Sequence, residues 1–132
     1  MKTYVIDAGV LSLYFAGDKR VEKYFYEIDE GKAKGLLCDV NLAEYYYKTC
    51  EKLGKEIAEI RFYQIRGSAI RVVPTTEELV KKAGEKKCKH RKKLSLADCF
   101  VLALAELEHA IILTTDPELE KLKDIKVKFF PV

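Results

Sequence analysis

Four acidic residues each stand beside an apolar segment, where a charged side chain is unfavourable unless it has a partner. They are Asp7, Glu44, Asp98 and Asp116. If these carboxylates gather in one place, they repel one another, and cations between them relieve the repulsion. Hard divalent ions that prefer oxygen ligands, Mg²⁺ or Mn²⁺, suit such a set. One or two such ions would polarise a phosphodiester, so the pattern predicts metal-assisted phosphodiester hydrolysis.

Asp98 stands in the most apolar surroundings of the four. It is the only charged residue between Leu94 and Glu106, in a stretch that is apolar on every side and predicts a buried helix. A lone carboxylate there is costly unless something positive lies beside it. The helix offers an alternative partner, because Ser95 and Asp98 have the spacing of a capping box.

The other three acids also have plain structural interpretations, which the sequence leaves open. Asp7 follows a strand-like run and opens a helix, which is typical of an N-cap. Asn41 and Glu44 have a second capping-box spacing. Asp116 precedes Pro117, the usual pairing of an N-cap with the first helical residue. Only a convergence of all four side chains would separate a catalytic site from a set of helix caps.

Strands and helices alternate along the chain and would position these acids. Strands are expected at 3–6, 35–38, 70–73, 110–115 and 127–130. Helices are expected at about 10–15, 19–30, 41–52, 55–66, 76–83 and 94–105, and just after Asp116. This order predicts an α/β fold with three layers, a mostly parallel five-stranded sheet flanked by helices. Sites in such sheets form at the carboxyl ends of the strands, where Asp7, Glu44 and Asp116 should lie. Topology alone does not bring Asp98 to that edge.

Length and composition restrict the class of protein. With 132 residues and 48% apolar content, the chain is expected to form a single domain over residues 1–132. It has no apolar run of about 18 residues and no signal-peptide pattern after Met1, so a cytoplasmic protein without a membrane segment is expected. Its four cysteines lack C-x-x-C spacing and are expected to be free thiols.

A basic segment leads directly into the helix that carries Asp98. Residues 81–93 contain eight Lys or Arg residues and His90, against the single acid Glu85. Such a run is ordinarily a solvated surface. Beside a group of acids, however, it also suits a polyanion that is both held and hydrolysed.

Taken in order, the acidic motifs resemble those of PIN-domain ribonucleases, and most closely those of small prokaryotic VapC-type toxins of toxin–antitoxin pairs. The motifs are Asp7 with Val10-Leu11, Asn41-Leu42-Ala43-Glu44, Leu96-Ala97-Asp98 and Leu113-Thr114-Thr115-Asp116. The resemblance implies a PIN-like fold and a metal-dependent endoribonuclease acting on RNA. It further implies that Asp7, Glu44, Asp98 and Asp116 bind Mg²⁺ or Mn²⁺, with Thr114 orienting a carboxylate or a water. A homodimer and a cognate antitoxin are implied in the same way.

The chain departs from this family pattern at one place. Ala8 and Gly9 follow the first acid, where the family often has Ser, Thr or Asn. A hydrogen bond to Asp7 is therefore expected to be missing, with a cost to metal affinity and rate.

Several rival functions are weaker or need a separate test. A phosphatase would carry a second acid two residues after Asp7, where Gly9 stands. A dinucleotide-dependent oxidoreductase lacks its G-x-G-x-x-G motif. Two alternatives stay open: a PIN-like module that binds RNA or a protein through residues 81–93 without cleavage, and a housekeeping RNA-processing nuclease. Metal dependence of cleavage separates the enzyme from the binding module.

Overall fold

Five parallel strands form the centre of the computed structural model, which describes all residues from Met1 to Val132. The strands are β1 (Lys2–Ile6), β2 (Ala33–Cys38), β3 (Arg71–Val73), β4 (Ile111–Thr114) and β5 (Val127–Phe129). Their spatial order is β3-β2-β1-β4-β5, and every neighbouring pair is parallel. The predicted parallel five-stranded sheet is thus confirmed. Chain order reverses at β1, which pairs with β2 on one side and β4 on the other.

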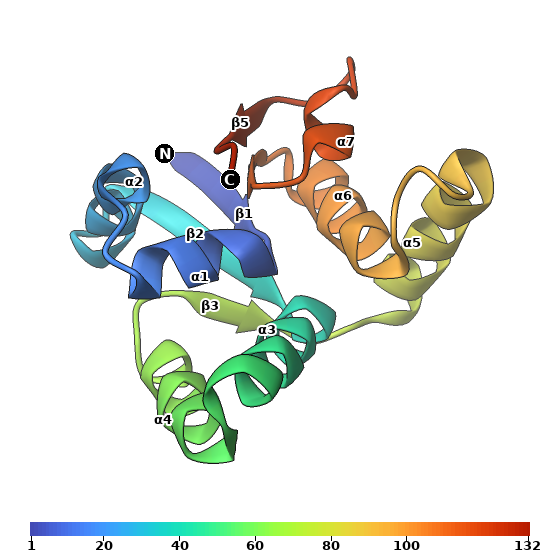
Figure 1. Cartoon of the computed structure of the whole chain (residues 1–132). Helices are drawn as coiled ribbons and strands as arrows, with labels where there is room; N and C mark the ends of the chain where they lie inside the picture. The colour runs from blue at the N-terminus through green and yellow to red at the C-terminus, as the bar shows by residue number, and fades with distance from the viewer.

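Helices cover both faces of this sheet (Figure 1). They are α1 (Ala8–Phe15), α2 (Lys19–Asp29), α3 (Asp39–Leu53), α4 (Lys55–Arg66), α5 (Glu77–His90), α6 (Leu96–Glu108) and α7 (Pro117–Glu120). Side chains alternate across β1, so Tyr4 and Ile6 face a hydrophobic cluster built with α1 to α4. Val5 faces a second cluster, built with α5, α6 and α7. The three predicted layers therefore follow from the period of two along the strand.

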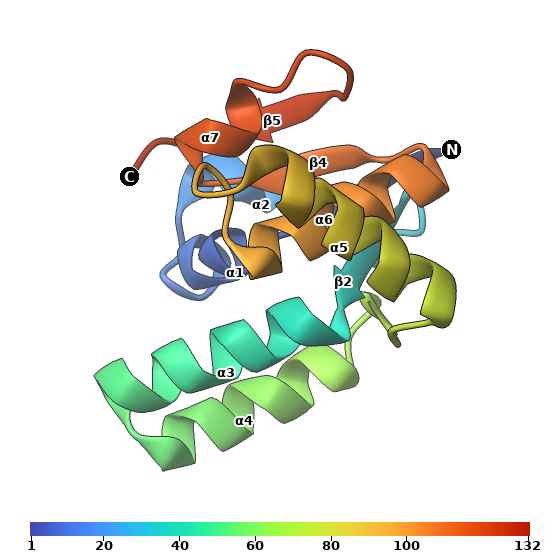
Figure 2. The same ribbon diagram turned by 90° about the vertical axis from the view of Figure 1, so that its right-hand side faces the viewer.

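Figure 2 shows α3 and α4 lying side by side as an antiparallel pair, and α5 packed along α6. The α6 helix is the most deeply buried, because every residue from Cys99 to Ala105 is covered. Its apolar character therefore reflects a place in the protein core. No helix of the structure combines the length and hydropathy needed to cross a membrane.

Two helices begin or end differently from the sequence-based expectation. The capping box predicted for Asn41 and Glu44 is wrong, because α3 begins at Asp39 directly after β2 and Cys38 is its N-cap, without a side-chain hydrogen bond. Asn41 instead lies within the first turn of α3. The α5 helix was expected to end near Ala83 but continues to His90. Within the added turns, Lys86 pairs with Glu106 of α6, and Lys87 donates hydrogen bonds to the carbonyl oxygens of Arg91 and Leu94.

Candidate active site

Asp7 lies at the carboxyl end of the central strand β1 and is only 5% exposed. It is the N-cap of α1, where its Oδ1 accepts a hydrogen bond of 3.0 Å from the Val10 amide. Its Oδ2 accepts hydrogen bonds from the Thr114 hydroxyl and, at 3.2 Å, from the Thr115 amide. Burial raises the pKa of Asp7 to about 6, although these three donors oppose the rise; the charge of Glu44 adds to it. The N-cap interpretation is correct, and the same carboxylate has a second oxygen facing β4.

The end of β4 holds the segment Thr114–Asp116 against Asp7. Thr114 is fully buried, and its hydroxyl accepts a hydrogen bond of 2.9 Å from the Asp116 amide while donating to Asp7. Asp116 is the N-cap of α7, because its Oδ1 accepts a bond of 2.9 Å from the Glu118 amide. Thr114 therefore links the first acid to the backbone of the last one.

Asp98 lies in the first turn of α6, and its amide donates a hydrogen bond of 3.1 Å to Ser95 Oγ. This is the half of the predicted capping box that the structure contains. Burial raises the pKa of Asp98, and so do a hydrogen bond to the Asp116 side chain and the charge of Asp116. The hydrogen bond with the Ser95 side chain lowers the pKa of Asp98, whereas the charge of Asp7 raises it further. Asp98 therefore favours retaining its proton beside the carboxyl group of Asp116.

Glu44 occupies the second turn of α3, with a side chain 19% exposed. Its negative charge raises the pKa of Asp7. Its Oε2 lies 3.1 Å from Nζ of Lys48, one turn further along the helix. Burial lowers the pKa of Lys48, but the bond and charge of Glu44 outweigh it, and the charge of Asp98 contributes in the same direction. Lys48 is therefore a cation at the margin of the acidic group.

Asn41 connects the helices that carry Glu44 and Asp98. It is fully buried, and its Nδ2 donates a hydrogen bond of 3.0 Å to the carbonyl oxygen of Ala97. Its Oδ1 is buried without a hydrogen-bond partner. The bond brings the amino end of α6 to the amino end of α3, at the carboxyl edge of the sheet. This contact settles the location of Asp98, which topology alone had left open.

The four acids form a series in which each carboxyl group lies near the next. Electrostatic contacts join Glu44 to Asp7, Asp7 to Asp98, and Asp98 to Asp116. No group of three or more His, Cys, Asp or Glu side chains is close enough to hold a metal ion directly. The structure therefore brings the four predicted residues to one edge of the sheet without collecting their oxygens around one point.

The packing around Gly9 explains why no Ser, Thr or Asn follows Asp7 at that position. A Cβ atom at Gly9 would overlap the Thr115 hydroxyl and come within 3.2 Å of its Cβ, so close packing of α1 against the end of β4 needs glycine here. Asp7 has three hydrogen-bond donors from Val10, Thr114 and Thr115. The carboxylate is well oriented although no hydroxyl or amide side chain directly follows it.

Sequence reasoning missed the parts played by Lys48 and Asn41. The Glu44–Lys48 pair has the i, i+4 spacing of a helical ion pair, so this signal was present. The Asn41 bond to Ala97 spans 56 residues, and nothing local indicates it.

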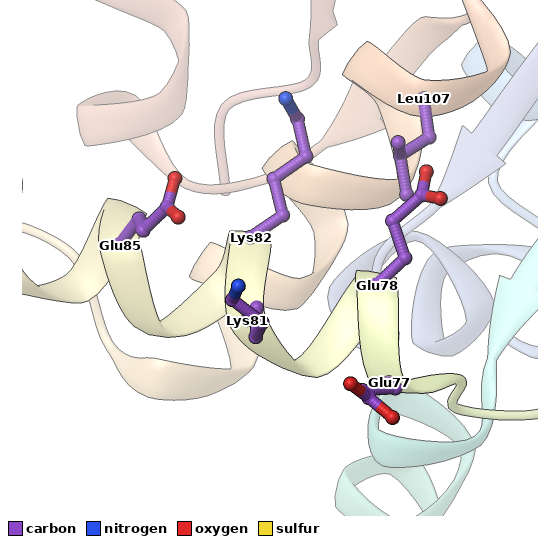
Figure 3. A pocket seen from close by; sticks show the side chains of 6 residues that line it. All are labelled: Glu77, Glu78, Lys81, Lys82, Glu85 and Leu107. Atoms are coloured by element: carbon purple, nitrogen blue, oxygen red, sulfur yellow. The ribbon is translucent and has the colours of Figure 1, made fainter.

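A shallow depression on the outside of α5 offers a contrast with the acidic group. Figure 3 shows it lined by Glu77, Glu78, Lys81, Lys82, Glu85 and Leu107. Its volume is about 550 Å³, its charges are mixed, and none of the four acids reaches it. It has the character of a solvated helix surface.

Comparison with models of known protein families identifies the family of this chain. A family model described as the PIN domain matches residues 4–125. The chain belongs to the PIN-domain family. No curated protein gave a match.

Several solved structures have the same fold as this chain. DNA-bound VapBC from Salmonella typhimurium has a TM-score of 0.77 at 13% identity, covering 97% of this chain and 98% of that one. VapC20 from Mycobacterium tuberculosis, described as a sarcin–ricin loop cleaving toxin, has a TM-score of 0.69 at 19% identity, with coverages of 94% and 98%. FitAcB from Neisseria gonorrhoeae has a TM-score of 0.70 at 18% identity, with 97% of each chain covered. This PIN domain thus has the fold of VapC proteins over nearly its whole length.

Proposed function

We propose that this PIN domain is a metal-dependent endoribonuclease of the VapC toxin type. The observation that supports it most is the carboxyl pair of Asp98 and Asp116 beside Asp7, at the carboxyl edge of a parallel sheet. Carboxyl groups with raised pKa values at this location, here those of Asp7 and Asp98, are typical of a functional site, and we infer a cation site. The resemblance of the four acidic motifs to those of PIN-domain ribonucleases implies the same kind of ion, and the family model matches residues 4–125.

The proposed ligands are Asp7, Glu44, Asp98 and Asp116, and the proposed ions are Mg²⁺ or Mn²⁺. All the donors are carboxylate oxygens, which suit hard divalent ions. The raised pKa values of Asp7 and Asp98 fit the same proposal, because a nearby cation would stabilise their charged forms. Since no three of these side chains are grouped closely enough to bind an ion, we expect carboxylate rotation or bridging waters to complete the coordination.

The protein side chains have distinct roles in this proposal. Three donors fix the orientation of Asp7, and Thr114 is the proposed orienting hydroxyl. Lys48 balances part of the negative charge beside Glu44 and Asp98. When bound, the metal would supply Lewis-acid polarisation of the scissile phosphodiester.

The proposed substrate is RNA, and the proposed partner is a cognate antitoxin. VapC20 is described as cleaving the sarcin–ricin loop, and the Salmonella structure is a VapBC complex. A homodimer and a cytoplasmic location belong to the same proposal. One observation favours the alternative of a non-cleaving RNA-binding module, namely the lack of a ready three-donor group.

Asp98→Asn tests the proposal against that alternative. We expect wild-type protein to cleave single-stranded RNA with Mn²⁺ and to stop when EDTA is added. Asp98→Asn should abolish cleavage and weaken Mn²⁺ binding measured by calorimetry, while RNA affinity is kept or raised. Asp124→Asn, a change at an exposed acid near β5, is the matched control and should cleave normally. Cleavage by Asp98→Asn at the wild-type rate, or unchanged cleavage in EDTA, would contradict the proposal.

A further inference from the structure

The basic segment 81–93 divides into a structural part and an uncommitted part. Lys82 and Lys86 pair with Glu106 of α6, at 3.3 Å and 2.7 Å. Nζ of Lys87 donates hydrogen bonds to the carbonyl oxygens of Arg91 and Leu94, at 2.6 Å and 2.7 Å. These three lysines hold α5 against α6 and close the end of α5. Their ammonium groups therefore already have partners within the protein.

The uncommitted part is residues 89–93, the end of α5 and the start of the turn toward α6 in Figure 2, which we call the basic turn. A surface hollow of about 480 Å³ is lined there by five residues, all basic: Lys89, His90, Arg91, Lys92 and Lys93. His90 is half-buried and the other four are exposed. None of the five forms an ion pair in the structure. A concave surface with five basic side chains and no carboxylate concentrates positive potential.

The backbone of this turn is held in place. The Arg91 amide donates a bond of 2.7 Å to the Lys87 carbonyl oxygen, and the Lys93 amide donates one of 2.9 Å to that of His90. Leu94, which follows, is almost completely buried. The basic side chains therefore project from an ordered backbone. An anion that binds them does not have to order this backbone, so the entropic cost of binding is smaller.

We infer that the basic turn 89–93 binds RNA phosphates next to the site of cleavage. The turn precedes α6 directly, and Asp98 lies in the first turn of that helix. A strand whose backbone occupies the hollow would therefore lie beside the segment that leads into the helix of Asp98. Exposed lysines spaced along a turn match successive phosphates and read no base, so this contact contributes affinity without sequence preference. The inference rests on the proposed nuclease function and adds to it the surface that holds the substrate.

The test is a triple variant, Lys89→Gln with Lys92→Gln and Lys93→Gln. Its matched control changes three exposed lysines at the opposite, amino-terminal edge of the sheet: Lys2→Gln, Lys34→Gln and Lys126→Gln. Binding of a labelled single-stranded RNA is measured in EDTA by fluorescence anisotropy over a range of NaCl concentrations. This readout requires neither metal nor cleavage. A Lys→Arg version of the triple variant keeps the charges and should bind as wild type does.

We expect the triple Gln variant to bind RNA at least tenfold more weakly at low salt. The slope of log affinity against log salt should fall by about 2, since each lost phosphate contact on a single strand contributes about 0.7. If wild-type protein cleaves RNA, the variant should show a raised KM with kcat nearly unchanged. Mn²⁺ binding and the melting temperature should match wild type in the Lys89/Lys92/Lys93→Gln variant and in the Lys2/Lys34/Lys126→Gln control.

Two results would overturn the inference. One is an equal loss of RNA affinity in the two triple variants, which would indicate only a general effect of net charge. The other is an unchanged affinity and salt slope in the 89–93 variant. A wild-type protein that neither cleaves RNA nor binds Mn²⁺ would instead refute the nuclease proposal, and the anisotropy comparison would still decide whether the turn binds RNA.

Discussion

Asn41 on α3 donates its side-chain hydrogen bond to the carbonyl oxygen of Ala97, the residue before Asp98. The two residues are far apart in sequence, yet their bond fixes the distance between the helices that carry Glu44 and Asp98. Because Asn41 is fully buried, its replacement by a smaller residue removes this bond inside the contact between α3 and α6.

Asn41→Ala is expected to lower the free energy of unfolding by about 0.5–1.5 kcal/mol, the usual net contribution of one intramolecular hydrogen bond. It should also lower RNA cleavage, because α6 is no longer held against α3. Chemical denaturation and cleavage rates below the melting transition measure the two effects. Thr76→Ala removes the N-cap bond to Leu79 in α5 and should cost about 1 kcal/mol without loss of activity. Equal activity losses in both variants would mean that stability alone explains the effect.

Gly9→Ala is expected to reduce both stability and activity. The added methyl group overlaps the Thr115 side chain, so α1 or the segment 114–116 must move, and Asp7 loses hydrogen-bond geometry. Overpacking of this kind typically costs about 1–3 kcal/mol. Gly84→Ala in α5 is the control, because no atom lies within 4 Å of its added Cβ. That variant should gain about 0.5–1 kcal/mol from helix propensity. A Gly9→Ala protein with wild-type stability would disprove the predicted collision.

The metal-free protein is expected to lose stability as the pH rises. The pKa of Asp7 rises from 3.8 to about 6 on folding, so between these values the folded state binds more protons than the unfolded chain. The penalty is absent below the lower pKa and complete above the higher one. For the buried Asp7 it amounts to roughly 3 kcal/mol. The pKa of Asp98 is raised as well, so its penalty has the same sign.

Denaturation of wild type and Asp98→Asn in EDTA over a pH series checks this prediction. The two proteins should have similar stability at low pH, and the variant should become the more stable one as the pH rises. Mn²⁺ should stabilise wild type at neutral pH and the Asp98→Asn variant less. A difference between wild type and Asp98→Asn that does not change with pH would contradict the raised pKa of Asp98, which burial and the Asp116 carboxyl group cause.

Lys48→Gln is expected to raise Mn²⁺ affinity a few-fold. Lys48 lies 3.1 Å from Glu44 and feels the charge of Asp98, so it competes with a bound cation for both. Its side chain is 52% exposed, and an i, i+4 pair of this kind contributes only about 0.3–0.5 kcal/mol to stability. Calorimetric titration with Mn²⁺ measures the affinity, and Lys48→Arg, which keeps the charge, should bind as wild type does. Weaker Mn²⁺ binding by Lys48→Gln would show that Lys48 assists the metal site by orienting Glu44.

The sequence by itself determined the parallel sheet, the two covered faces and the location of Asp7 and Asp116. Local patterns are sufficient for these features, because strand-to-helix alternation and the period of two along β1 dictate them. The N-cap roles of Asp7 and Asp116 are equally local and were predicted correctly. The assignment of the four acids as metal ligands remains a prediction.

Only the tertiary structure decided where Asp98 lies and what Asn41 does. The capping box at Asn41 and Glu44 failed because β2 passes into α3 without a loop, so Asn41 lies inside the helix and turns toward Ala97. The division of the basic segment likewise depends on Glu106, which binds Lys82 and Lys86 from the neighbouring helix. These are contacts between segments distant in the chain, and their partners are selected by the packing of helices on the sheet.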